Sequence, residues 1–147
     1  MNRRNFSALA LLAMATLMTA AVASAQDRAR ADIPFAFRAG NKPLPAGTYE
    51  VNIGRLDSRT IVVQNSETGD ASAILVQSLD EPRRDTTDAT LVFHKCGSLY
   101  FLSQVRMPDL TRNLPMTKLE REVTREQAES AANDAGPRLV YIAARLP

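Results

Sequence analysis

Two apolar runs that flank Cys96-Gly97 constrain this chain more than any other segment does. They extend over residues 89–106, and a glycine at the second position of a two-residue loop is typical of a tight β-hairpin. If Lys95 pairs with Ser98, each face of the hairpin carries four mainly apolar residues. They are Val92, His94, Leu99 and Phe101 on one face, and Leu91, Phe93, Tyr100 and Leu102 on the other. Because both faces are apolar, we expect the hairpin to be central, with a second sheet on one side and a helix or loop on the other.

Alternation of apolar and polar residues predicts several further short strands. The expected strands cover residues 33–37, 48–53, 60–65, 71–79 and 139–144, the last of which pairs with an early strand or with the central hairpin. Proline, glycine and asparagine predict loops over residues 40–47 and 107–115, and residues 26–32 read as an N-terminal lead without an apolar face.

One helix is expected near the C-terminus. Thr117 and Glu120 have the spacing of a capping box, which predicts a helix over about residues 117–132. Its apolar stripe consists only of Leu119, Val123 and alanines, so we expect it to lie on the surface. The predicted fold is mainly β: a single β-sandwich or flattened β-barrel of six to eight short antiparallel strands with one C-terminal surface helix.

The N-terminal segment, residues 1–25, has the three parts of a secretory signal. It contains a basic pair, an apolar run and a small-residue cleavage site, which are Arg3-Arg4, residues 8–22 and Ala23-Ser24-Ala25. We expect cleavage before Gln26 and export of residues 26–147 as one β-rich domain, periplasmic or extracellular, without a membrane span. The Arg3-Arg4-Asn5-Phe6 segment also resembles a twin-arginine signal, so general secretory and twin-arginine export both stay open.

The charge of the expected mature chain is balanced. Without Arg3 and Arg4 of the signal segment, 16 basic residues face 16 acidic residues. A neutral chain has no electrostatic reason to bind nucleic acid or an anionic membrane, so we expect neither partner.

His94 and Cys96 are the only histidine and the only cysteine in the chain. A zinc site needs three or four protein ligands, so this pair alone predicts no metal site, and no other cofactor is indicated. A single cysteine in an exported protein is either a free thiol or an intermolecular disulfide. Because Cys96 is expected in the hairpin turn, we predict an exposed thiol and a monomer or homodimer.

The sequence indicates no catalytic constellation. Alternate residues of one strand lie about 7 Å apart, too far for His94 to activate Cys96 through a hydrogen bond. We therefore expect a non-catalytic envelope or extracellular module with a binding or structural role and an unknown partner. One alternative is a carrier of a small apolar ligand in a β-barrel, for which the candidate ligand-binding residues are His94, Phe93, Tyr100, Phe101 and Tyr141.

A second alternative is a hydrolase-type enzyme that uses His94. This hypothesis requires His94 to lie in an open cleft within hydrogen-bond reach of an acid. A buried His94 bonded to backbone would exclude it.

Segments 33–37, 44–51 and 91–102, followed by Leu114-Pro115, resemble a group of small, signal-bearing bacterial proteins of uncharacterised function. The shared patterns are PF.F..G...LPAG.Y.V, then L.FH..G..YFL..V, then LP.S..E.E at the start of a terminal helix. The resemblance covers about residues 33–125 and implies export and a fold, but no catalytic or binding residues. Cys96 stands where the group has an aromatic residue, usually tyrosine, which argues against a required thiol, and residues 137–147 extend beyond the helix.

Overall fold

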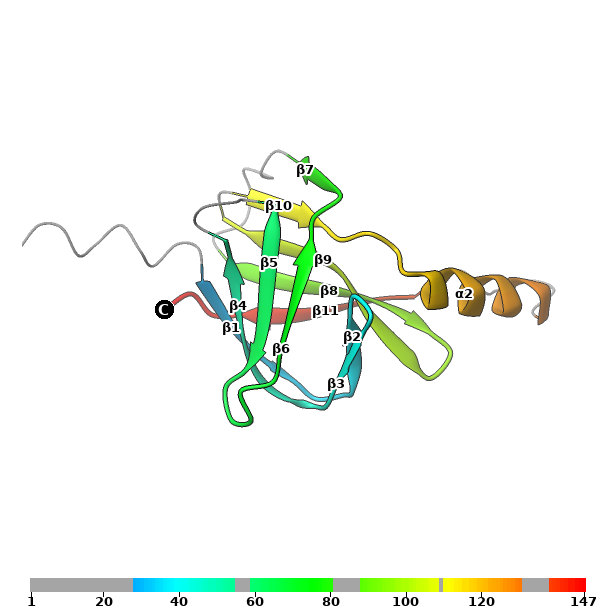
Figure 1. The fold of residues 1–147 in the computed structure, drawn as a ribbon, viewed down its shortest axis with the longest axis horizontal. Helices are drawn as coiled ribbons and strands as arrows, with labels where there is room; N and C mark the ends of the chain where they lie inside the picture. The colour runs from blue at the N-terminus through cyan, green and yellow to red at the C-terminus, as the bar shows by residue number, and fades with distance from the viewer. Residues whose placement is uncertain (1–27, 55–58, 81–87, 109, 131–137) are drawn as a thin grey trace, which may run out of the picture.

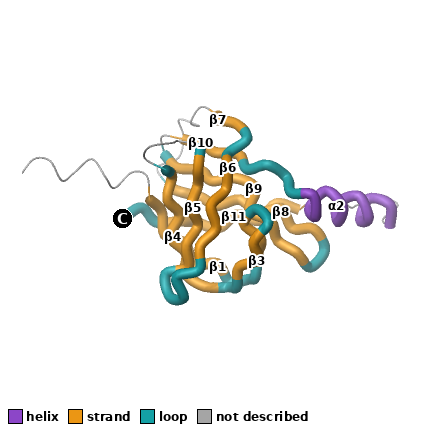
Figure 2. Tube along the Cα trace, in the orientation of Figure 1, coloured by secondary structure: helices purple, strands orange, loops and turns teal. Residues whose placement is uncertain are grey.

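The architecture is a pair of β-sheets with one helix. A computed structural model describes residues 28–54, 59–80, 88–108, 110–130 and 138–147. Figure 1 shows the two sheets layered on each other, with the helix extending away from them, and Figure 2 shows how strands dominate the chain. The expected mainly β, sandwich-like fold with one C-terminal helix is confirmed, and the strands of the described residues do not close into a barrel. The expected signal segment, residues 1–25, lies outside the described residues.

The first sheet, here sheet A, has four antiparallel strands in the order β1-β4-β5-β6. Their bounds are Arg28–Ile33 for β1, Gly47–Ile53 for β4, Thr60–Asn65 for β5 and Ala71–Leu75 for β6. The expectation that residues 26–32 form a lead is wrong for most of that segment. Ala29, Ala31 and Ile33 alternate as buried residues along β1, and alanines are too weakly apolar to reveal that pattern in the sequence.

The second sheet, here sheet B, has the order β11-β8-β9-β10-β7. The bounds are Arg138–Ala144 for β11, Ala89–Cys96 for β8, Leu99–Met107 for β9, Leu110–Asn113 for β10 and Ser78–Asp80 for β7. Two short strands, β2 (Phe37–Ala39) and β3 (Lys42–Leu44), pair with each other, and β2 also lies parallel to β9.

The final strand joins the two sheets. β11 pairs with β8 of the central hairpin, which is one of the two arrangements expected from the sequence. Arg145, just beyond β11, forms a backbone bridge with Arg30 of β1. The described residues contain eleven strands rather than six to eight. The difference arises because strands of three or four residues form inside segments that were expected to be loops, such as β3 within residues 40–47 and β10 within residues 107–115.

The central hairpin forms, but its register differs from the expected one. His94 pairs with Phe101, so the loop consists of Gly97 and Ser98, and Cys96 belongs to β8. Gly97 has a φ of 60°, and a glycine with positive φ at the first loop position is typical of a type II′ turn. The partners of Phe93, His94 and Lys95 move by two residues along β9 relative to the expectation, and a β-bulge between Val92 and Phe93 moves the partner of Val92 by three. The two faces therefore keep their expected residues.

Both faces of the hairpin are covered, as its composition predicts. Leu91, Phe93 and Leu102 join the core between the sheets. Val92 and Phe101 are buried on the opposite side, here called the outer face of sheet B, outside that core cluster. The central position of the hairpin is therefore confirmed.

Aromatic rings fill the core beneath the hairpin. Phe93 makes edge contacts with Phe35 and Phe37, each with ring centroids 5.3 Å apart, and Phe35 stacks on Tyr100 at 4.0 Å. Phe37 also makes an edge contact with Tyr49, which is fully buried and donates its hydroxyl hydrogen bond to the carbonyl of Pro45. Packed edge-to-face rings stabilise the interior beyond the area they bury.

The loop that connects β5 and β6 depends on Asn65. Its buried side-chain oxygen accepts hydrogen bonds from the backbone N–H groups of Glu67 and Thr68, at 2.8 and 2.9 Å. We expect Asn65→Ala to lower the free energy of unfolding by about 1–3 kcal/mol, because it leaves both donors without their acceptor. Urea denaturation is the measurement, with Gln64→Ala at an exposed neighbouring position as the control. An equal effect of both variants would contradict this role of Asn65.

Candidate functional site

The N-terminus of helix α2 (Lys118–Ser130) has the expected capping box. The backbone N–H of Glu120 donates to Thr117 Oγ1 at 3.1 Å, and the backbone N–H of Thr117 donates to Glu120 Oε2 at 3.4 Å. Reciprocal bonds of this kind satisfy backbone donors that the first helical turn leaves unpaired. The sequence-based prediction of the helix start is confirmed.

The same glutamate anchors the helix on sheet B. Glu120 is only 3% exposed, and its Oε1 lies 2.8 Å from Nδ1 of His94, near the C-terminal end of β8. A carboxylate only accepts hydrogen bonds, so the proton of this bond belongs to His94 Nδ1. Glu120 therefore caps its own helix with one oxygen and holds the imidazole with the other.

A second contact lies one helical turn further along. The Sγ atom of Cys96 is 3.4 Å from Oγ1 of Thr124, whose hydroxyl donates to the backbone carbonyl of Glu120 at 2.7 Å. Since that hydroxyl proton is already used, the thiol is the donor in the Cys96 contact.

The spacing of these contacts explains how a helix sits on a strand here. His94 and Cys96 are two residues apart on β8, a rise of about 6.6 Å, while Glu120 and Thr124 are four residues apart on α2, a rise of about 6 Å. These two distances are similar, and both contacts advance in the same direction, so β8 and α2 run parallel where they touch. We call His94, Cys96, Glu120 and Thr124 the helix seat.

Beyond the seat, α2 leaves the sandwich, as Figure 1 shows. Lys118 and Glu122 form an exposed ion pair one turn apart, and so do Arg125 and Glu129. Such exposed pairs contribute little stability. The helix is therefore held on the sheet chiefly by its first two turns.

A cleft opens on the outer face of sheet B beside the seat and has a volume of about 340 Å³. We call it the outer-face cleft. Its polar side chains come from β8, β9 and β10, and leucines from two other segments flank them; the residues are His94, Gln104, Arg106, Asn113, Leu114 and Leu139. Val92 and Ser103 also line it. The side chain of His94 is 26% exposed.

The polar side chains of the outer-face cleft form a connected network. Arg106 Nε donates to Gln104 Oε1, and Gln104 Nε2 donates to Asn113 Oδ1. The guanidinium carbon of Arg106 also lies 5.6 Å from the ring centroid of Tyr141, a cation–π arrangement. These contacts fix the orientation of the Arg106 guanidinium at the cleft.

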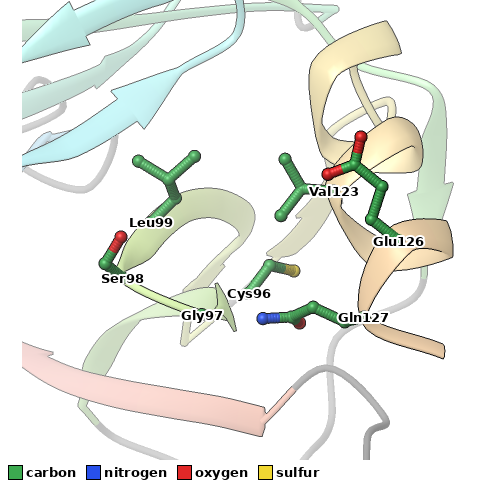
Figure 3. A pocket seen from close by; sticks show the side chains of 7 residues that line it. All are labelled: Cys96, Gly97, Ser98, Leu99, Val123, Glu126 and Gln127. Atoms are coloured by element: carbon green, nitrogen blue, oxygen red, sulfur yellow. The ribbon is translucent and has the colours of Figure 1, made fainter. Parts of the chain in front are cut away.

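A smaller cleft of about 310 Å³ lies between the hairpin turn and the helix. In Figure 3, Leu99 and Val123 approach from opposite sides, and the side chain of Gln127 points from the helix towards Gly97. A Cβ atom at Gly97 would lie 2.7 Å from Gln127 Nε2. Glycine suits this turn for its positive φ, whereas the end of the flexible Gln127 side chain could move away from a Cβ atom.

The structure separates the residues proposed for an apolar ligand. Phe93 and Tyr100 belong to the core side of the hairpin, whereas Phe101 is buried on the outer face. Tyr141 lies on β11 and is 54% exposed. These four side chains do not line one common space, and His94 faces the helix and the outer-face cleft.

The expectation of an exposed Cys96 is wrong. The residue is 1% exposed because the hairpin register places it in β8, under the helix. We predict that the native thiol reacts with a disulfide reagent more slowly than the urea-unfolded chain, by at least about tenfold. A colorimetric thiol assay measures both rates. Equal rates would show that the helix seat is open in solution.

The described part of the chain has no cluster of three or more His, Cys, Asp or Glu residues placed to hold a metal ion. Among the helices in the same residues, none is long and apolar enough to cross a membrane. Comparisons of the chain with protein-family models, with curated proteins and with solved structures gave no match.

Sequence reasoning missed most of the polar residues at this site. Glu120 was recognised only as a helix cap, since nothing in a separation of 26 residues links it to His94. Gln104 and Arg106 share the face of Val92 because a β-bulge interrupts the pairing between Val92 and Phe93, whereas strict alternation from Phe101 would place them on the core side. Asn113 was missed because its segment was expected to be a loop.

Proposed function

We propose that this protein is an exported, non-catalytic module that binds a partner or ligand through the outer face of sheet B. The supporting observation is the outer-face cleft, in which an ordered polar network lies beside exposed apolar side chains of β11. Leu139 and Tyr141, both exposed, flank this network. Exposed apolar groups next to fixed polar groups are typical of binding surfaces.

The helix seat supports a non-catalytic role for His94. Its Nδ1 is bonded to a carboxylate that also caps α2, so the His94–Glu120 pair has a structural task that accounts for its burial. His94 of the helix seat also lines the outer-face cleft. Docking of the helix therefore positions one residue of the binding surface.

Cell fractionation and turnover assays test this proposal together. We expect the processed chain, beginning at Gln26, in the exported fraction. The purified chain should hydrolyse chromogenic esters, peptides and glycosides no faster than buffer does. An unprocessed chain confined to the cytoplasm, or turnover that His94→Gln abolishes, would contradict the proposal.

A hydrolase that uses His94 is the second candidate, and one observation favours it. His94 lies on an open cleft and 2.8 Å from an acid, which is the geometry that this hypothesis requires. Ser103 lines the same cleft, but its hydroxyl donates to the carbonyl of Val92 at 3.0 Å. Loss of ester turnover in both His94→Gln and Ser103→Ala, with unchanged unfolding curves, would establish this candidate.

A further inference from the structure

We infer that the outer-face cleft binds a small carboxylic acid with a short apolar tail, whose carboxylate is held by Arg106. This inference rests on the proposed function, because it names the ligand of that same surface. It does not concern the core between the sheets, where the ring of Phe93 is already in contact with the rings of Phe35 and Phe37.

Charge selects an anion at this cleft. Arg106 is the only Lys, Arg, Asp or Glu side chain among the described residues that line it. The nearest acid of the helix seat, Glu120, is buried and has both carboxylate oxygens engaged, one by His94 and one by the backbone of Thr117. The cleft therefore presents a cation without an opposing carboxylate on its surface.

Geometry selects a planar, two-oxygen anion. Arg106 uses Nε to hold Gln104, and its terminal guanidinium nitrogens have no hydrogen-bond partner within the part of the chain that the structure describes. Two parallel N–H groups of a guanidinium match the two oxygens of a carboxylate. The bond to Gln104 and the cation–π contact with Tyr141 orient the guanidinium in advance, which reduces the entropy lost on binding.

The walls and the size select the tail. Val92, Leu114 and Leu139 supply apolar surface beside the polar network. A volume of about 340 Å³ lies near the lower end of the 300–1,000 Å³ that is usual for small-molecule sites. A chain of a few methylenes fits such a site better than a long lipid does.

The single histidine provides a clean readout. Because His94 lines the cleft and no other histidine exists, the NMR spectrum of the mature protein contains one set of imidazole signals. We expect octanoate to shift the His94 ring signals and the side-chain amide signals of Gln104 in a saturable way. Octanamide, which has the same tail without the charge, should bind at least about tenfold more weakly.

Two variants separate the carboxylate contact from a change in folding. Arg106→Gln should weaken octanoate binding about 10- to 100-fold, as expected for the loss of a charge-assisted hydrogen-bonded pair. Arg30→Gln is the matched control, since Arg30 is exposed on β1 and lines a separate cleft with Arg145. It should bind octanoate as the unmodified chain does. Urea denaturation of both variants verifies that they fold.

Three results would overturn the inference: no saturable shift with octanoate, equal binding of octanoate and octanamide, or equal binding by Arg106→Gln and Arg30→Gln. None of them contradicts the broader binding-module proposal, which fails on localisation or on His94-dependent turnover. The two failures are therefore distinguishable.

Discussion

Phe93→Ala is expected to lower the free energy of unfolding by about 3–5 kcal/mol, the largest effect of any single substitution considered. Phe93 is fully buried, and its ring contacts both Phe35 and Phe37 at centroid distances of 5.3 Å. Removing the ring leaves a cavity between the two sheets and takes away two edge-to-face contacts. Urea denaturation monitored by far-UV circular dichroism measures the change.

Tyr141→Ala is the matched aromatic control for this prediction. Tyr141 is 54% exposed on β11 and makes its ring contact with Arg106 at the surface. Its removal should change the free energy of unfolding by less than about 1 kcal/mol. A small effect of Phe93→Ala would indicate that the ring borders open space, which would return attention to a carrier with an interior ligand.

Glu120→Ala is expected to lower the free energy of unfolding by about 2–4 kcal/mol, because it removes a helix cap and the carboxylate partner of His94 together. We also expect α2 to fray, with faster amide exchange and lower helical circular dichroism. Burial of the helix seat should decrease as well, so the Cys96 thiol should react faster in this variant than in the unmodified chain.

Two comparisons isolate the contact between Glu120 and His94. Glu122→Ala removes an exposed carboxylate from the same helix and should change stability by about 0.5 kcal/mol or less. A double-mutant cycle of Glu120→Ala with His94→Ala should give a coupling energy of about 1–3 kcal/mol. A coupling energy near zero would mean that the pair does not hold the helix on β8.

Much of the fold was predictable because its signals are local. Alternation in β4 and β5, the two apolar faces of the central hairpin and the spacing of Thr117 and Glu120 each depend on a few neighbouring residues. The hairpin register was not predictable in the same way. A glycine suits either loop position, and a shift of two residues leaves both faces unchanged, so the apolar pattern does not distinguish the two registers.

The candidate site was less predictable because it depends on contacts between distant segments. His94 was recognised as notable, but its partner Glu120 lies on a helix that docks only through matched strand and helix spacings. The burial of Cys96 follows from the same docking. The Arg106 network required knowledge that β10 pairs with β9, which brings Asn113 beside Gln104.

The central claim is that Glu120 holds His94 by Nδ1 and thereby sets one side of the outer-face cleft. The most direct test is ¹⁵N NMR of the one imidazole, in the unmodified chain and in Glu120→Ala, which removes the acceptor, at a pH where the ring is neutral. The account predicts a proton fixed on Nδ1 and protected from exchange with water in the unmodified chain, and a loss of that protection in the variant. A ring that exchanges rapidly between tautomers, with the same signals in both proteins, would contradict it.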